Sequence, residues 1–349
     1  MAFLKYFLLP FSWLYALILK TRHWLYDKGL LNGRTAAVKT IIIGNLEFGG
    51  TGKSPHTLWV ANQLKDFEST AILSRGYGRR SKGFFKVNIN SHTQEVGDEP
   101  LMMKQTCPEL EVAVCEDRLK GIETLAEEGR KVIILDDAFQ HRPLRGGLRM
   151  LITTFERPFT DNRLVPAGTL RDLKSRASSA DIVIVSKCPP NLSEKQCEKL
   201  KGQVSTYSNA KVYFSEMVYN RPVRLDGREG ELLDRSSVIV LSALAHNEVF
   251  QAKVGETYNV MHALSYTDHH RYSAQDLGKV KSILSTFAGL EIAVLTTAKD
   301  AVKLKESGWV EELGEVPIFV LPLEVRILND EAHLIEQLNA YVRTNQGNN

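Results

Sequence analysis

Cysteine is scarce in this 349-residue chain and follows no recognisable pattern. The four cysteines form no CxxC pair and have no spacing typical of a zinc site or a disulfide framework; they are Cys107, Cys115, Cys188 and Cys197. This scarcity excludes a small module stabilised by disulfides and indicates reduced thiols in a cytosolic protein.

A large excess of charge of one sign is also missing. Lys and Arg total 44 against 41 Asp and Glu, and a net charge of +3 is too small in a chain of this length to indicate nucleic-acid binding. The basic excess is concentrated in residues 1–40. Hydrophobic residues at 43% and charged residues at 24% are typical of a soluble globular protein, and the length predicts two domains.

The N-terminal region lacks a hydrophobic run long enough to cross a bilayer comfortably. Fourteen uncharged residues lie between Lys5 and Lys20, which as a helix would reach about 21 Å against a hydrocarbon core of about 30 Å. From Phe11 onward, apolar residues recur at helical spacing, and aromatic residues lie beside Lys and Arg. We predict an amphipathic membrane-interface helix over residues 1–24. A helix packed on the protein's own core is the alternative, and a signal peptide is disfavoured because no cleavage site follows.

Short apolar runs alternate with helix-like stretches along most of the chain. The runs cover residues 39–44, 70–74, 111–115, 131–135, 149–153, 181–186 and 212–218. This alternation predicts an α/β fold with a parallel sheet covered by helices on both faces. We expect a first domain over residues 25–218, a polar, turn-rich linker over 219–236 and a smaller α/β domain over 237–349.

The most informative stretch is IIIGNLEFGGTGKSPHT, in which a β-branched run leads through glycines into Lys53, Ser54 and a helix-compatible segment. Strand, glycine-rich turn and helix form a phosphate-binding arrangement, in which backbone N–H groups approach the phosphate oxygens. The predicted loop residues are Gly49, Gly50, Thr51, Gly52, Lys53 and Ser54. Lys53 would reach the β- and γ-phosphates of a nucleotide and Ser54 would ligate magnesium. The usual first glycine is replaced by Glu47, so the motif is a variant.

A second stretch, KVIILDDAFQH, places Asp136 and Asp137 directly after an apolar run. A phosphoryl-transfer site needs such a carboxylate beside the phosphate loop to hold the metal ion. On its own the pair is more often a solvated acidic turn, but together with Lys53 and Ser54 it indicates a magnesium site.

Three further clusters are weaker candidates for a functional site. LSRGYGRRSKGFFK is a basic loop suited to an anionic ligand, VGDEPLM carries Asp98 and Glu99, and TDHHRY carries Asp268, His269 and His270. A solvated loop or a structural histidine explains each of them equally well in isolation.

Seven motifs together resemble the tetraacyldisaccharide 4'-kinase family, the lipid A 4'-kinases of Gram-negative bacteria: GNLEFGGTGKSP, LSRGYGRR, GDEPLMM, ILDDAFQH, VPAGTLRD, DHH and TTAKDAVKL. Their order and spacing match that family from Gly44 to Leu304. The resemblance implies a P-loop NTPase-like kinase that uses ATP and Mg²⁺ to phosphorylate the 4'-hydroxyl of tetraacyldisaccharide 1-phosphate, giving lipid IVA. It also implies a peripheral or monotopic protein on the cytoplasmic face of the inner membrane. The expected partners are the lipid substrate and that membrane surface, with no nucleic acid and no obligate protein partner.

The resemblance also implies roles for individual residues. Asp98 would be the base that takes the proton of the sugar hydroxyl, His269 would pair with it, and Gln140 would support this centre. Substrate or nucleotide contacts are implied for Arg75, Tyr77, Arg118 and Arg171. Ala298 stands where the family has an acidic residue, so no role of that side chain is carried over.

Two other functions are compatible with parts of the sequence. A membrane-associated P-loop ATPase or GTPase that acts as a switch or targeting protein would account for the phosphate loop and the helix. It would leave Asp98 and His269 unused, and the guanine-reading N-K-x-D sequence is absent. A metal phosphoesterase is suggested only by Asp268, His269 and His270, and would have no use for Lys53.

Overall fold

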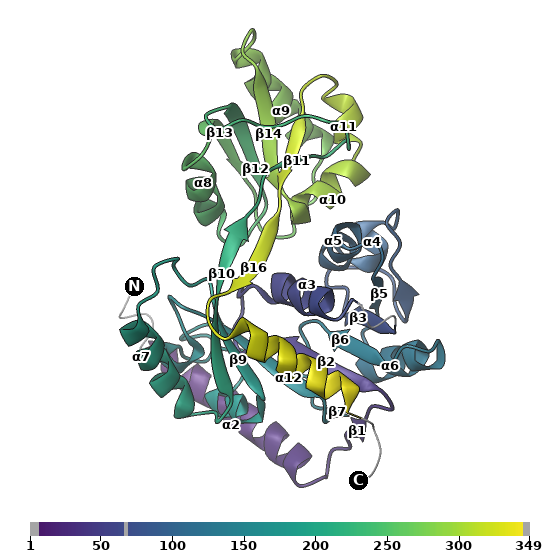
Figure 1. Ribbon diagram of the computed structural model, residues 1–349, viewed down its shortest axis with the longest axis vertical. Coiled ribbons are helices and arrows are strands. Elements are labelled where there is room, and N and C mark those ends of the chain that lie inside the picture. Colours follow the sequence, from purple (N-terminus) through teal and green to yellow (C-terminus); the bar gives the residue numbers. More distant parts are fainter. Residues whose placement is uncertain (1–6, 66–68, 345–349) are drawn as a thin grey trace.

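The computed structural model describes residues 7–65 and 69–344, which form two α/β units stacked one above the other (Figure 1). The larger unit contains a nine-stranded sheet in the order β16-β10-β9-β8-β2-β6-β3-β5-β4. Its strands are β2 (Lys39–Gly44), β3 (Thr70–Ser74), β4 (Phe85–Lys86), β5 (Glu111–Val114), β6 (Val132–Leu135), β8 (Leu148–Thr154), β9 (Ile182–Ser186), β10 (Lys211–Tyr219) and β16 (Leu323–Ile327). Neighbouring strands are parallel except at the two edges, where β4 and β16 are antiparallel.

Helices cover both faces of this sheet, as the alternating sequence predicts. They are α3 (Lys53–Gln63), α4 (Thr93–Val96), α5 (Asp98–Thr106), α6 (Arg118–Glu127), α7 (Glu194–Ser205) and α12 (Glu331–Arg343); two short strands, β1 (Arg34–Thr35) and β7 (Leu144–Arg145), pair separately. Ile41 and Ile43 pack in a cluster with Leu334 of α12, whereas Ile42 packs on the opposite face with Ile122 of α6. The three isoleucines are fully buried, so β2 lies at the centre of a sheet without a solvent-exposed face.

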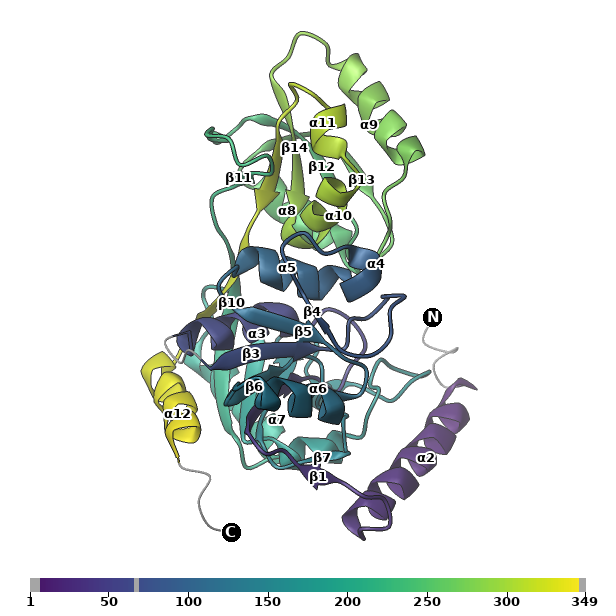
Figure 2. The ribbon, with the colours of Figure 1, turned by 90° about the vertical axis from the view of Figure 1, so that its right-hand side faces the viewer.

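The smaller unit is built on a five-stranded sheet in the order β11-β15-β14-β12-β13. Its strands are β11 (Val223–Arg224), β12 (Ser237–Ser242), β13 (Asn259–Ser265), β14 (Ile292–Thr297) and β15 (Ile318–Leu321), and its helices are α8 (Asn247–Gly255), α9 (Ala274–Thr286), α10 (Ala298–Glu306) and α11 (Trp309–Glu312). Two hydrophobic clusters of its own lie on the two faces of this sheet. In Figure 2, α10 of this unit lies directly above α5 of the larger unit.

The C-terminal boundary expected from the sequence is corrected by the strand order. The segment 237–349 was expected to belong entirely to the smaller unit, but β16 pairs with β10 and α12 crosses a face of the larger sheet (Figure 1). The core of the larger unit buries Val325 and Ile327 of β16 and Leu334 and Leu338 of α12. Burial of these side chains explains why the C-terminal segment packs on the larger unit. The β10–β16 ribbon therefore joins the two units. In addition, β11, inside the expected linker, is a strand of the smaller sheet.

The N-terminal helix α2 (Leu9–Asp27) packs on the protein through the side that carries Ser12, Leu19 and His23. Ser12 Oγ donates a hydrogen bond to the carbonyl oxygen of Leu164 (3.0 Å), and His23 Nε2 lies 2.7 Å from Asp172 Oδ1. The apolar side faces outward, and its exposed members are Phe11, Trp13, Leu14, Leu17, Ile18 and Trp24. Residues 1–6 of the predicted helix lie outside the described residues. None of the described helices is long and apolar enough to cross a membrane.

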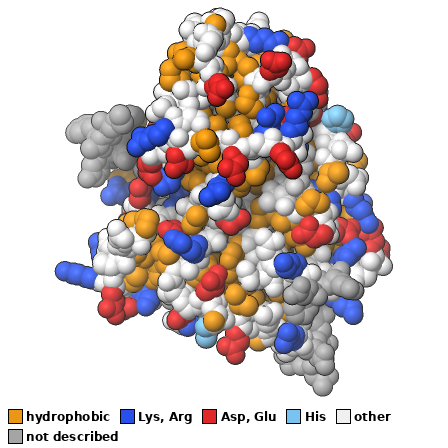
Figure 3. Space-filling model, turned by 45° about the horizontal axis from the view of Figure 1, so that its top comes forward, with side chains coloured by type: hydrophobic (Ala, Val, Ile, Leu, Met, Phe, Trp, Pro, Cys, Tyr) orange, Lys and Arg blue, Asp and Glu red, His pale blue; other side chains and the backbone are white. Residues whose placement is uncertain are grey.

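Charged side chains of both signs are interspersed on the face drawn in Figure 3. Lys and Arg lie beside Asp and Glu there rather than forming one continuous basic area. On that face, positive and negative side chains are therefore mixed rather than separated into areas of one sign.

Candidate functional site

The predicted phosphate loop connects the end of β2 to the start of α3. Gly52 is the N-cap residue of α3 and has φ +90°, and Gly49 has φ +108°, so both positions need the left-handed freedom of glycine. Thr51 fixes the loop from two sides, because its hydroxyl accepts a hydrogen bond from Asn45 Nδ2 (2.8 Å) and its carbonyl oxygen accepts one from Ser186 Oγ (2.7 Å). Lys53 begins the helix, with the free N–H groups of the first turn beside it.

Glu47, which replaces the usual first glycine, points into the protein. Its side chain is buried, and its carboxylate accepts a hydrogen bond from Asn162 Nδ2 at 3.3 Å. Burial raises the pKa of this carboxyl group. Its backbone forms a bridge with Leu170, so the variant residue ties the loop to the segment that carries Arg171.

Asp136 and Asp137 follow β6, the parallel neighbour of β2, and therefore lie at the same edge of the sheet as the phosphate loop. Asp136 accepts hydrogen bonds from Thr57 Oγ1 (3.0 Å) and Ser74 Oγ (3.3 Å). Burial, followed by the charges of Glu99 and Asp137, raises the pKa of Asp136 to about 7.

Asp137 has a left-handed backbone, with φ +47°. Its carboxylate lies 3.7 Å from Lys53 Nζ and accepts a hydrogen bond from Arg171 Nη1 at 3.2 Å. Burial acts to raise its pKa, but the charges of Lys53 and Arg171 outweigh burial and hold the pKa below its ordinary value. The structure therefore brings the lysine of the loop, one carboxylate of the pair and Arg171 together.

Ser54 donates a hydrogen bond from its hydroxyl to Glu99 Oε2 at 2.7 Å. The hydroxyl of Ser54 and the carboxylates of Asp136 and Asp137 are hard oxygen donors, the kind that Mg²⁺ prefers. Within residues 7–65 and 69–344, no cluster of three or more His, Cys, Asp or Glu side chains could hold a metal ion by itself. The donor set nevertheless fits Mg²⁺, which usually takes one or two carboxylates and completes its coordination with water and phosphate.

The second part of the site forms where the two units meet. Asp98 is the first residue of α5, and His269 lies in the loop between β13 and α9, with φ +61°. His269 Nδ1 is 2.9 Å from Asp98 Oδ2 and 3.2 Å from Oδ1. The hydrogen bond to Asp98 raises the pKa of His269 above its ordinary value. Burial acts to raise the pKa of Asp98, but the hydrogen bond with His269 and the charge of Lys299 hold it below its ordinary value.

The remaining predicted residues surround these two parts in different ways. Gln140 Nε2 donates a hydrogen bond to the carbonyl oxygen of Asn45 at 2.6 Å, next to the phosphate loop. The ring of Tyr77 meets that of His269, with centroids 5.2 Å apart, and Arg75 is exposed at the end of β3. Arg118 is buried and directs its guanidinium to backbone carbonyl oxygens beneath the site, including that of Cys115 (2.9 Å).

The sequence indicated Glu99 only as part of a weaker candidate cluster and assigned no role to Lys299. Glu99 binds Ser54, and Lys299 Nζ lies 3.2 Å from Glu99 Oε1 and 3.9 Å from Asp98 Oδ2. The available signal was the GDE and TTAKD motifs, each of which places charged residues at the start of a helix. His270 lies outside the site, because its Nε2 pairs with Asp276 Oδ2 at 3.0 Å.

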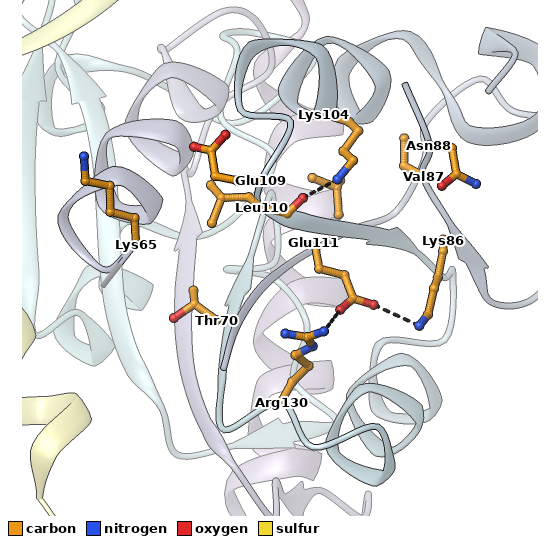
Figure 4. A pocket seen from close by; sticks show the side chains of 11 residues that line it. Lys65, Thr70, Lys86, Val87, Asn88, Lys104, Glu109, Leu110, Glu111 and Arg130 are labelled. Carbon is orange, nitrogen blue, oxygen red and sulfur yellow. Dashed lines mark hydrogen bonds and ion pairs between the residues drawn. The ribbon is translucent and has the colours of Figure 1, made fainter. Parts of the chain in front are cut away.

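A hollow of about 420 Å³ lies at the end of the large sheet where β3 and β5 begin, opposite the end that carries the phosphate loop (Figure 4). Its lining includes Thr70 and Glu111, which begin β3 and β5, whereas the phosphate loop follows the end of a strand. Glu111 is neutralised there by Lys86 (3.1 Å) and Arg130 (2.5 Å). This hollow is therefore separate from the site described above.

Comparisons with known proteins show which family the chain resembles. Residues 4–343 match the family model described as LpxK, tetraacyldisaccharide-1-P 4'-kinase. The chain is 33% identical to the tetraacyldisaccharide 4'-kinase of Phocaeicola vulgatus over 351 residues, covering 98% of this chain and 96% of that protein. It is 35% identical to the enzyme of that name from Bacteroides fragilis over 353 residues, covering 98% and 94%.

A solved structure is similar over almost the whole chain. It is the "apo" form of LpxK from Aquifex aeolicus in complex with ATP, with a TM-score of 0.77, 30% sequence identity and coverage of 97% of this chain and 99% of that one. With the match to the family model and the full-length relatives, this likeness shows that the chain belongs to the tetraacyldisaccharide-1-phosphate 4'-kinase family.

Proposed function

We propose that this protein transfers the γ-phosphoryl group of ATP to the 4'-hydroxyl of tetraacyldisaccharide 1-phosphate, forming lipid IVA and ADP. The observation that carries this proposal is that a phosphate loop and the Asp98–His269 pair lie in one site. A phosphate loop with its carboxylate pair lies in the larger unit, and Asp98 of that unit pairs with His269 of the smaller unit. Membership of the kinase family supplies the acceptor.

The phosphate loop is suited to hold the nucleotide. Its backbone N–H groups and the start of α3 favour negative charge, so they would bind the phosphate oxygens. Lys53 would balance the charge on the β- and γ-phosphates, and Arg171, held beside Asp137, would lie near the same charge. Both cations act where negative charge accumulates in a loose transition state.

Ser54, Asp136 and Asp137 would hold Mg²⁺. When bound, this ion would neutralise charge on the phosphates of ATP. Within the protein itself, Asp137 keeps Lys53 and Arg171 near the loop. Asp136 stays buried among the hydroxyl groups of Thr57 and Ser74.

Asp98 would act as the base toward the sugar hydroxyl. The hydroxyl proton passes to the Asp98 carboxylate, the hydroxyl oxygen forms a bond to the γ-phosphorus, and the bond from that phosphorus to the bridging oxygen breaks, leaving its electron pair on ADP. His269 orients Asp98 through its Nδ1. A pKa held below its ordinary value keeps Asp98 ionised at neutral pH, ready to accept the proton.

The helix α2 would place this chemistry at the cytoplasmic membrane surface. Its outward apolar side, with Trp13 and Trp24 more than half exposed, is suited to the headgroup region, while the side that carries Ser12 and His23 packs on the protein. A substrate with four acyl chains stays in the bilayer, so a peripheral or monotopic enzyme would meet it there.

Flotation with anionic phospholipid vesicles tests this placement. The double variant Leu14→Glu, Leu17→Glu should lose vesicle binding and have a higher KM for the lipid, without a loss of folding, because both side chains face outward. Val249→Glu, at an exposed position on α8, is the matched control. Vesicle binding equal to that of the wild type would contradict the membrane role.

The reaction is tested by following label from [γ-³²P]ATP into tetraacyldisaccharide 1-phosphate in mixed micelles containing Mg²⁺. The wild type should label the lipid, and Lys53→Ala should reduce the rate by about a hundredfold or more, because it removes a cation that acts on the transferred group. Lys65→Ala, which changes an exposed lysine far from the loop, is the control. Lys53-dependent hydrolysis of ATP without labelled lipid would overturn the proposed acceptor and favour the nucleotide-dependent switch.

A further inference from the structure

Lys299 lies at the contact between the two units and is unaccounted for by the proposed reaction. It belongs to the first turn of α10, which begins after Thr297, whose hydroxyl caps the helix by accepting a hydrogen bond from Asp300 N. The Lys299 side chain is only 13% exposed, and α10 packs against α5 (Figure 2). A lysine buried to this degree at a contact between units is normally paired.

The Lys299 ammonium group binds carboxylates from both units. Its Nζ donates to Asp268 Oδ1 at 2.9 Å in the smaller unit and to Glu99 Oε1 at 3.2 Å in the larger unit. It also lies 3.4 Å from His269 Nε2. The Asp98 carboxylate lies 3.9 Å away. Burial acts to lower the pKa of Lys299, but the charges of Glu99, Asp98 and Asp268 outweigh burial and raise it, so the lysine remains charged.

The two nearest carboxylates belong to residues adjacent to the catalytic pair. Asp268 precedes His269, and its Oδ1 also accepts the backbone N–H of His269 at 3.0 Å. Glu99 follows Asp98, and its own backbone N–H donates to Asp98 Oδ1 at 3.0 Å. Each of these residues thus forms a hydrogen bond with its neighbour in the pair, and Lys299 binds both of them.

The same lysine connects the pair to the phosphate loop. Glu99 accepts from Lys299 with Oε1 and from Ser54 with Oε2 (2.7 Å). A continuous chain of polar contacts therefore runs from Asp268 through Lys299 and Glu99 to Ser54. Since His269 has a left-handed backbone that is unfavourable for a residue with a side chain, its position depends on such contacts.

We propose that Lys299 is a positioning residue that aligns the Asp98–His269 pair with the phosphate loop across the contact between the units. It acts through Asp268 and Glu99 rather than on the reacting atoms. This role rests on the proposed kinase function and adds to it a residue that sets the geometry of proton removal. Loss of such alignment should lower the rate of transfer more than the affinity for ATP, because small displacements of a base affect the transition state most.

A simple interface contact is the competing explanation, and the chain offers a matched control for it. Glu306, on the same helix, crosses the same contact by accepting hydrogen bonds from Thr93 Oγ1 (2.6 Å) and Thr93 N (3.1 Å), and lies 3.2 Å from His92 Nδ1. None of these atoms belongs to the site. Glu306→Gln therefore weakens the contact between the units while leaving the catalytic pair and its neighbours in place.

The experiment compares Lys299→Met, Lys299→Arg and Glu306→Gln in the micelle assay, with KM for ATP, KM for the lipid and kcat measured separately. Lys299→Met should lower kcat by about tenfold or more and change KM for ATP by less than about threefold. Lys299→Arg, which keeps the charge, should recover part of kcat. Glu306→Gln should stay within about twofold of the wild type.

The proposal is overturned if Lys299→Met lowers kcat no more than Glu306→Gln does, or if its whole effect is on KM. Should Lys299→Met fail to fold, as judged by thermal unfolding, Asp268→Ala, which removes the acceptor for both Lys299 and the His269 backbone N–H, decides the matter. That change should lower kcat at unchanged KM for ATP, and an unaltered kcat refutes the proposal. Failure of the kinase function itself is distinguishable, because the wild type would then label no lipid.

Discussion

The phosphate loop and the Asp98–His269 pair belong to one site, but they are assembled in different ways. The loop is a single stretch of chain between β2 and α3, held by the side chains of Asn45 and Ser186 of the larger unit. The pair joins residues 171 positions apart, one from each unit, through side-chain contacts. The loop should therefore depend on local backbone conformation, whereas the pair depends on how the two units are placed.

Among changes to the Asp98–His269 pair, replacing the carboxylate of Asp98, the proposed base, should reduce kcat the most. Asp98→Asn keeps the size of the side chain but cannot accept the substrate proton as a carboxylate does, so kcat should fall by about a hundredfold to ten thousandfold. Affinity for ATP should change little, because Asp98 does not contact the loop. Both values follow from the labelling assay and from equilibrium binding of a fluorescent ATP analogue.

An equal loss of ATP affinity and of kcat in Asp98→Asn would contradict the separation of loop and pair. Lys53→Ala provides the opposite pattern for comparison, since it removes a group that, in the proposed site, contacts the nucleotide in the ground state and in the transition state.

The loop could be predicted from the sequence because its information is local. A β-branched run, glycines and Lys53-Ser54 occupy neighbouring positions, and their physical roles follow from residue type. The carboxylates Asp136 and Asp137 could also be placed, because parallel strands end at one edge of a sheet. The parallel sheet with helices on both faces followed from the alternation of apolar runs.

The contacts between distant segments could not be derived in this way. The pairing of Ser215 with Ile327 in the β10–β16 ribbon joins segments more than a hundred residues apart, and a short apolar run does not specify its partner. For the same reason no role could be assigned to Glu99 or Lys299 from the sequence, since their contact forms only where α5 and α10 meet. Asp98 and His269 were assigned through the resemblance to a family, not by spacing.

Near the phosphate loop, adding a methyl group to a closely packed glycine should destabilise the protein more than adding one to a glycine with free space around it. A Cβ atom on Gly44 would lie 2.6 Å from Phe139 Cβ and 2.8 Å from the Phe139 backbone N, so Gly44→Ala should push the end of β2 away from the Asp136–Asp137 turn. We expect a loss of about 1–3 kcal/mol in the free energy of unfolding, as for other overpacked sites. Urea unfolding measures it.

Gly50→Ala is the matched control for that change. A Cβ atom on Gly50 would meet nothing within 4 Å, and its backbone φ is ordinary, so the free energy of unfolding should change by less than about 0.5 kcal/mol. If both variants unfold at the same urea concentration, the close approach of β2 to the turn does not stabilise the site.

The smallest expected effect is the pH dependence of the stability that the Asp98–His269 pair contributes. The hydrogen bond to Asp98 raises the pKa of His269 above 6.5, so its contribution to stability is complete below pH 6.5 and is lost as the pH rises through the higher, folded-state pKa. The pKa of Asp98 lies below 3.8 in the folded protein, because the hydrogen bond with His269 and the charge of Lys299 outweigh burial. Its contribution is therefore present above pH 3.8 and is lost as the pH falls through the lower value.

The ion pair between His269 and Asp98 should thus stabilise the protein most between pH 3.8 and pH 6.5. His269→Gln should lower the melting temperature by about one or two degrees there, because His269 is partly exposed and solvent screens the pair, and the difference should shrink toward pH 9. A difference between His269→Gln and the wild type that stays constant from pH 5 to 9 would mean that the pair contributes through packing rather than charge.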